Sequence, residues 1–258
     1  MLQAAVAMVN RTGLTVSLDH LSFEDIIRDA YVARSAVYRR WPYKDLFFSD
    51  LVKKLAQDAT PSIVNDELAL MRRVVAEHLD WLETPELRHS LVIELFRQLA
   101  ALDFQTMYGS AGWRTYIALH ATVMSLTEGQ PRKEVQVSLA RTEQDHTARV
   151  ANAWEQLVGL FGYRLRPELG ATFETMATLL IATMHGLIIM ALSTPEIAAH
   201  RAQARPFGAA ADDEWSLAAM GLASIASAFL EPDPAIKWDD ERLSSVRKAL
   251  SSLRPANP

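Results

Sequence analysis

The sequence predicts an all-α protein, in which a small N-terminal group of helices (residues 1–56) precedes a larger helical body (57–258). Apolar residues recur at three- and four-residue spacing along most of the chain. Helix start signals recur as well, since Ser22 precedes Glu24 and Asp25, and Thr84 precedes Pro85. No run alternates polar and apolar residues, so we expect no β-sheet.

The composition suits a folded protein with a sizeable core. Half of the 258 residues are hydrophobic and 22% are charged. The chain has no cysteine, which excludes disulfides and thiolate zinc sites. Its first residues carry no cationic, apolar signal-peptide pattern. Residues 173–192 are long and apolar enough to span a bilayer, but Glu174 and His185 interrupt them. We therefore expect a buried helix there and a cytoplasmic protein with no membrane partner.

The first 56 residues predict four short helices. Ser22 is a good N-cap for the second helix, and Pro42 ends the third because proline disfavours the α conformation in the preceding residue. A break of three residues, 31–33, separates the second helix from the third. Two short helices joined by a tight break are the helix-turn-helix layout. The predicted helices cover residues 2–9, 22–30, 34–41 and 44–57.

The charge of the chain is unevenly distributed. The net charge is −5, yet residues 31–56 carry six basic and two acidic side chains, interleaved with aromatic residues. In the third helix, Val37 and Trp41 can face a core while the polar side chains between them face outward. This pattern favours an interface with duplex DNA, in which basic residues contact phosphates and the helix reads base edges. The alternative is an ordinary solvated basic helix.

Residues 26–47, IIRDAYVARSAVYRRWPYKDLF, resemble the N-terminal signature of the tetracycline-repressor (TetR) family of bacterial regulators. That signature runs roughly I-A-x-x-A-G-V-S-x-x-x-L-Y-x-H-F-x-S-K-E-x-L. The resemblance covers about residues 2–56, and the remainder agrees only in its helical layout. The positions that carry the resemblance are Ala4, Ala5, Gly13, Ile26, Ala30, Val32, Val37, Tyr38, Trp41, Lys44, Asp45 and Phe47.

The resemblance implies a homodimeric transcriptional regulator, most simply a repressor that a small apolar effector releases from a palindromic operator. It implies DNA contacts by Ser22, Arg34, Ser35, Ala36, Tyr38, Arg39 and Lys44.

Three positions depart from the family pattern. Tyr31 replaces the turn glycine, which favours a turn of a different type because a positive φ is costly for a bulky side chain. Ile27 replaces a small alanine, which could change how closely the second and third helices pack. Ala33 replaces a serine N-cap.

The body predicts further helices from Asn65 and Thr84 onward, and then over residues 112–128, 134–161, 167–192, 213–230 and 239–253, the last as an appendage. Residues 173–192 and 215–230 are apolar on nearly every face and therefore need cover on all sides. A two-fold helical bundle with a second chain would supply that cover, as in TetR-like proteins. The alternative is that both helices fill the core of a monomer.

An apolar effector pocket is expected among aromatic, methionine and histidine residues of the middle helices. Each of these side chains alone also suits an ordinary core. The candidates are Trp81, Phe96, Tyr108, Trp113, Tyr116, His120, Met124, Trp154, Met176 and His185.

The competing interpretation is an all-α enzyme with a fortuitous basic helix. Glu143 and His146 match one copy of the Glu-x-x-His metal motif, whereas a di-iron bundle needs two. DDEW at 212–215 and DDER at 239–242 resemble the start of the aspartate-rich motif of terpene synthases, but both lack its last aspartate. We expect no catalytic residue, no metal and no cofactor.

Overall fold

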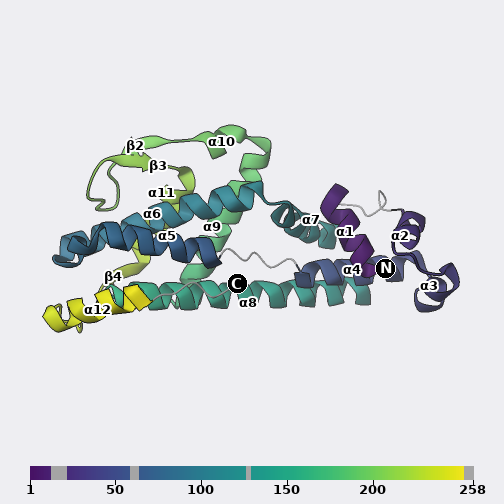
Figure 1. Cartoon of the computed structure of the whole chain (residues 1–258), viewed down its shortest axis with the longest axis horizontal. Coiled ribbons are helices and arrows are strands. Elements are labelled where there is room, and N and C mark those ends of the chain that lie inside the picture. Colours follow the sequence, from purple (N-terminus) through teal and green to yellow (C-terminus); the bar gives the residue numbers. More distant parts are fainter. Residues whose placement is uncertain (13–21, 59–63, 126–128, 253–258) are drawn as a thin grey trace. The chain divides into compact units, whose positions relative to one another are not determined.

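The computed structural model describes residues 1–12, 22–58, 64–125 and 129–252 (Figure 1). Most of these residues lie in helices, which confirms the predicted all-α class. The described chain divides into two compact units. Unit 1 comprises residues 1–61 and 109–146, and unit 2 comprises residues 62–108 and 147–258. The long helix α8 (Gln130–Leu160) contributes its first half to unit 1 and its second half to unit 2.

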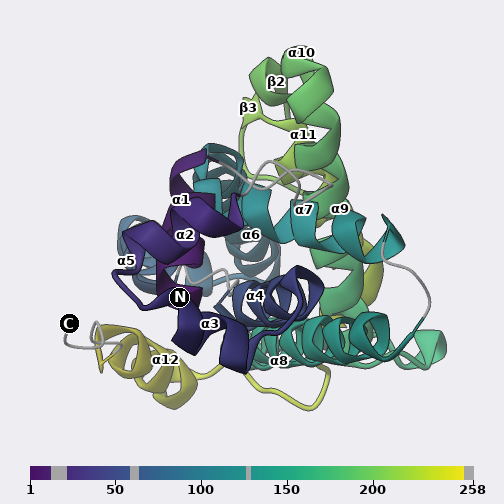
Figure 2. The ribbon, with the colours of Figure 1, turned by 90° about the vertical axis from the view of Figure 1, so that its right-hand side faces the viewer.

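Unit 1 contains four N-terminal helices close to those predicted: α1 (Leu2–Thr12), α2 (Phe23–Asp29), α3 (Arg34–Arg40) and α4 (Lys44–Asp58). Helix α1 lies beside α2, α4 and α7 (Ala111–Ser125), as Figures 1 and 2 show. Leu119 of α7 and Val135 of α8 share one apolar core with Ile26, Phe47 and Leu51. The N-terminal helices therefore pack with residues that the sequence prediction assigned to the body.

Unit 2 is built around a second set of helices. Its elements are α5 (Val64–Glu77), the 3₁₀ turns η2 (Leu79–Leu82) and η3 (Pro167–Leu169), α6 (Pro85–Gly109), α9 (Phe173–Ser193), α10 (Pro195–Ala199), α11 (Leu217–Phe229) and α12 (Asp240–Ser252). Helices α9 and α11 pack along one another. A Cβ atom added at Gly221 would lie 2.9 Å from Thr183 Cγ2, so glycine permits this close approach.

The expectation of no β-sheet is wrong, because unit 2 contains two short antiparallel pairs. Strand β1 (Tyr163–Leu165) pairs with β4 (Leu230–Pro232), and β2 (Ala202–Ala204) pairs with β3 (Asp213–Trp215). Each strand has three residues, which is too short to produce a recognisable alternation of polar and apolar positions. Since β3 occupies residues 213–215, helix α11 begins four residues later than predicted.

Among the residues that the structure describes, helix α9 buries only one of its faces. Met176, Leu180, Met184 and Ile188 are buried on that face. The opposite face includes Leu179, Ile189 and Met190, which are 42%, 50% and 54% exposed. Among the described residues, α9 is the one helix long and apolar enough to cross a membrane, and core helices of soluble proteins pass the same test.

The last helix is held firmly on unit 2, and the expectation of an appendage is wrong. Val246 of α12 is fully buried. Arg242 donates hydrogen bonds to the carbonyl oxygens of Gly159 and Leu160, at 3.1 and 3.0 Å, and thereby satisfies two acceptors at the end of α8. The ring of Trp238, just before α12, lies under the guanidinium of Arg88, 4.2 Å from its carbon to the ring centroid.

Candidate nucleic-acid interface

Helix α3 has one buried and one exposed side. Val37 and Trp41 are 3% and 7% exposed. The Trp41 indole stacks edge-on against Phe47 and donates a hydrogen bond of 2.9 Å from Nε1 to Asp50 Oδ2. The predicted DNA-contact residues of this helix are all exposed: Arg34, Ser35, Ala36, Tyr38 and Arg39. The buried side anchors the helix, and the other side faces solvent.

The turn before α3 places a tyrosine in a left-handed backbone conformation. Tyr31 has φ 51° and is 96% exposed. Its backbone N–H donates to the Arg28 carbonyl oxygen at 3.1 Å, which closes the end of α2. The expectation of a different turn type is wrong, because Tyr31 adopts the conformation that glycine would favour. The tyrosine carries the backbone strain without burying its ring.

The helix caps follow the sequence predictions. The Ser22 hydroxyl caps α2 by accepting a hydrogen bond of 3.2 Å from the backbone N–H of Asp25. Ala33 at the start of α3 provides no side-chain hydrogen bond. Ile27 is buried in the core of unit 1.

A single carboxylate joins two of the exposed residues of α3. Glu24 of α2 forms an ion pair with Arg34, and its Oε1 accepts a hydrogen bond of 3.1 Å from the Tyr38 hydroxyl. This hydrogen bond is the main reason why the pKa of Tyr38 lies above its ordinary value. In the sequence, Glu24 stands out only as an acid that suits a helix N-terminus, because its contacts with α3 arise between two separate helices.

Two further cations lie over aromatic rings at the C-terminal end of the same surface. The guanidinium carbon of Arg40 lies 5.0 Å from the Trp41 ring centroid, and Lys44 Nζ lies 5.2 Å from that of Phe48. Arg40 and Lys44 are both exposed. Trp41 and Phe48 are thus buried in the core and also support these two cations.

The predicted effector residues are divided between the two units. Trp113, Tyr116 and His120 belong to unit 1, and the side chain of Met124 lies outside the described residues. The others belong to unit 2: Trp81, Phe96, Tyr108, Trp154, Met176 and His185. Trp113 therefore lies in the same compact unit as the N-terminal helices.

Within unit 2, two of these residues are in direct ring contact. Phe96 and Trp154 stack with their ring centroids 3.8 Å apart and an interplanar angle of 6°. Phe96 and Met176 are fully buried, whereas Trp154 and His185 are partly exposed. Tyr108 donates a hydrogen bond of 3.4 Å to the Ala191 carbonyl oxygen. The Phe96–Trp154 stack is the aromatic pair that the structure brings together among the predicted effector residues of this unit.

His120 of unit 1 faces a glutamate. His120 Nε2 lies 3.4 Å from Glu143 Oε1, and the Tyr116 ring packs edge-on against the imidazole. Burial lowers the pKa of His120 and raises the pKa of Glu143, so burial favours the neutral form of each. Within the described residues, no group of three or more His, Cys, Asp or Glu side chains is arranged to hold a metal ion.

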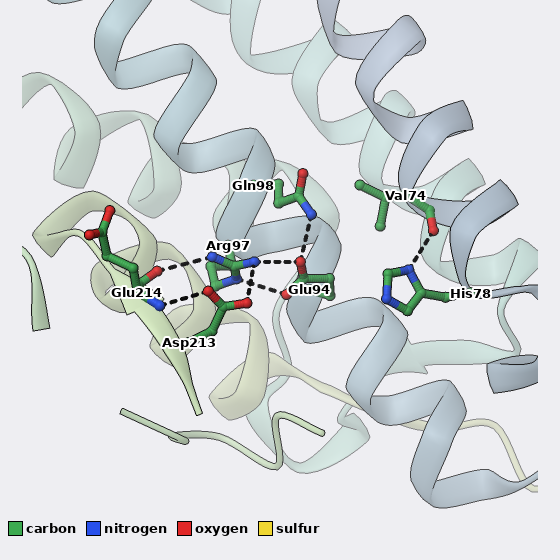
Figure 3. A network of polar contacts seen from close by, with 7 residues as sticks. All are labelled: Val74, His78, Glu94, Arg97, Gln98, Asp213 and Glu214. Carbon is green, nitrogen blue, oxygen red and sulfur yellow. Dashed lines mark hydrogen bonds and ion pairs between the residues drawn. The ribbon is translucent and has the colours of Figure 1, made fainter. Parts of the chain in front are cut away.

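Figure 3 shows a polar network in unit 2, made by Val74, His78, Glu94, Arg97, Gln98, Asp213 and Glu214. Arg97 donates two hydrogen bonds to the carboxylate of Glu94, at 2.6 and 2.7 Å, and pairs with Asp213 at 2.8 Å. Burial alone would raise the pKa of Glu94, but the hydrogen bonds from Arg97 and Gln98 outweigh it and hold the pKa below its usual value. The network joins α6 to β3, and its charges are paired.

Two partly buried acidic side chains of unit 2, Glu67 and Asp103, contact one another. Glu67 of α5 hydrogen-bonds to Asp103 of α6. Burial, together with the charge of Glu67 and this hydrogen bond, raises the pKa of Asp103 to about 8. The pKa of Glu67 is raised as well, mainly by burial, so the pair favours holding one proton over two ionised carboxylates. Ionisation of both carboxyl groups at high pH therefore lowers the stability of the folded protein.

No protein-family model matches the sequence, and no match was found among curated proteins or solved structures.

Proposed function

We propose that the protein is a homodimeric DNA-binding transcriptional regulator of the TetR type. Most simply, it is a cytoplasmic repressor that leaves a palindromic operator when a small apolar effector binds. The observation that carries this proposal is the two-sided α3: its apolar residues are buried, while Arg34, Tyr38 and Arg39 are exposed beside Lys44. A helix that enters the major groove needs this division between an anchored face and a polar face.

The exposed apolar face of α9 supports the dimer. Leu179, Ile189 and Met190 lie on one side of the helix, where water would otherwise cover them. A second copy of the same helix would bury this face around a two-fold axis. Two DNA-binding heads related by two-fold symmetry would then suit half-sites one helical turn apart, about 34 Å.

An effector can regulate DNA binding only if it binds the DNA-free and DNA-bound conformations with different affinities. A ligand that prefers the conformation unable to span the two half-sites shifts the population away from DNA. The stacked Phe96 and Trp154 of unit 2 favour an apolar or aromatic ligand.

The proposal is tested by removing single cations from the exposed side. Arg39→Ala should relax sequence preference, whereas Lys44→Ala should weaken binding to all duplexes about equally and reduce the salt slope by about one for each head. Arg247→Ala is the matched control, because it removes one exposed positive charge from α12 in unit 2. Fluorescence anisotropy with labelled duplexes at several salt concentrations measures these effects. If all three variants bind alike, the assignment of α3 as the reading helix is wrong.

A further inference from the structure

We infer that Glu24 is a specificity-determining residue: its carboxylate orients Arg34 and Tyr38 for base reading and disfavours binding to arbitrary DNA. This inference rests on the proposed function, since it concerns the same interface. It adds a residue from α2 to the reading surface of α3.

The geometry ties both α3 residues to one group. Arg34 and Tyr38 are four residues apart and so lie on one face of α3. The Glu24 carboxylate ion-pairs with Arg34 and accepts the Tyr38 hydroxyl hydrogen bond of 3.1 Å. The neighbouring Phe23 packs edge-on with the Tyr38 ring at a centroid distance of 5.9 Å, which further limits how that ring can turn.

The exposure of the pair argues against a purely structural role. The side chains of Arg34 and Glu24 are 70% and 46% exposed. Ion pairs in such positions contribute little to stability, because water and salt screen them. The contact instead restricts the rotamers of Arg34 and Tyr38, which would otherwise sample many conformations in solution.

The contact also sets which hydrogen bonds remain for a partner. A tyrosine hydroxyl has one proton, so Tyr38, while donating to Glu24, offers its oxygen only as an acceptor. In the major groove, an acceptor suits the exocyclic amino group of adenine or cytosine, and the free N–H groups of Arg34 suit guanine.

The negative charge of Glu24 also disfavours binding to arbitrary DNA. A carboxylate near the phosphates lowers affinity for any duplex, including those without the correct bases. Specificity is the difference between two affinities, so a group that weakens incorrect binding more than correct binding raises it. Glu24 is therefore expected to lower the affinity for every duplex and to raise the ratio of the affinities for correct and incorrect duplexes.

The test compares Glu24→Ala and Glu24→Gln with Asp25→Asn. Asp25 is the adjacent carboxylate on α2, but it pairs with Arg28 of the same helix rather than with α3. Asp25→Asn thus makes the same change in charge without releasing Arg34 or Tyr38. A random duplex pool is first selected with the wild-type protein, and dissociation constants are then measured for the enriched duplex and a shuffled one.

We expect Glu24→Ala to tighten binding to the shuffled duplex and to lower the ratio of the two affinities by about tenfold. Glu24→Gln, which keeps an acceptor oxygen for Tyr38, should lower it less. Asp25→Asn should leave the ratio unchanged. The inference is overturned if the wild type discriminates between the duplexes and Glu24→Ala keeps the same ratio. A wild type with no duplex affinity overturns both this inference and the proposed function.

A second readout does not depend on DNA. Because the hydrogen bond to Glu24 raises the pKa of Tyr38, Glu24→Ala should lower that pKa toward the ordinary value of tyrosine. NMR titration of ¹³C-labelled tyrosine measures it, with Asp25→Asn as the control. An unchanged Tyr38 pKa in Glu24→Ala would show that the contact does not persist in solution and would overturn the inference by itself.

Discussion

Replacing Tyr31 by glycine should stabilise unit 1. Tyr31 holds φ 51°, and a left-handed conformation costs a residue with a Cβ atom about 1–2 kcal/mol. Glycine removes this cost but adds freedom to the unfolded chain, which is worth about 0.4–1 kcal/mol. The ring is 96% exposed, so its removal loses almost no burial. The expected net gain in the free energy of unfolding is about 1 kcal/mol.

Hydrogen exchange of the buried amides in α2 and α4 measures this gain within unit 1, where about 1 kcal/mol corresponds to about fivefold slower exchange. Tyr31→Ala is the first control, because alanine retains the Cβ atom and therefore the strain. Val32→Gly is the second, since Val32 has no positive φ and glycine there should cost about 0.5–1 kcal/mol. If Tyr31→Gly exchanges no more slowly than Tyr31→Ala, backbone strain at this turn is not a significant term.

Three further predictions concern unit 2. The folded-state pKa of Asp103 is raised, so stability should fall as the pH rises from about 4 to about 8, by up to about 1.4 kcal/mol per pH unit. Urea denaturation across this range measures that slope, and Asp103→Asn should flatten it; an equal slope in the variant would exclude Asp103 as its source. Ile189→Lys, at the exposed face of α9, should convert a dimer to monomer in sedimentation with unchanged circular dichroism, because an unpaired buried charge costs several kcal/mol. A wild type that sediments as a monomer at micromolar concentration would contradict the dimer. An apolar compound that raises the melting temperature should also release DNA, and Trp154→Ala should blunt both effects; release that Trp154→Ala does not alter would place the effector elsewhere.

Gly221 is unsuitable for testing the dimer. A Cβ atom at this position would already lie 2.9 Å from Thr183 Cγ2 within the same chain. Any larger residue would therefore disturb the packing of α9 against α11 before it reached a second copy. The exposed position 189 avoids this ambiguity.

The N-terminal helices were predictable because their signals are local. The Ser22 cap, the proline after α3 and the spacing of Val37 and Trp41 each depend on residues close in sequence. The turn at Tyr31 was predicted wrongly, because residue preference alone could not show that the remaining turn contacts tolerate its strain.

The remaining features depend on contacts distant in sequence. Glu24 meets Arg34 and Tyr38 only after two helices are placed together, so these contacts had no sequence signal beyond the charge of Glu24. The three-residue strands arise where separate segments meet, as in β1 with β4. The packing of α7 with the N-terminal helices likewise joins residues about 70 positions apart, as between Leu51 and Leu119.

The salt dependence of duplex binding by the unmodified protein tests the central claim most directly. If each of two heads neutralises two phosphates through Arg40 and Lys44, the logarithm of the binding constant should fall with the logarithm of salt concentration with a slope of about −4. Anisotropy titrations on genomic fragments and on a selected palindrome, from low to physiological salt, measure this slope. A slope of this size with tighter binding to the palindrome is the predicted result. No salt-sensitive affinity for any duplex would contradict the account.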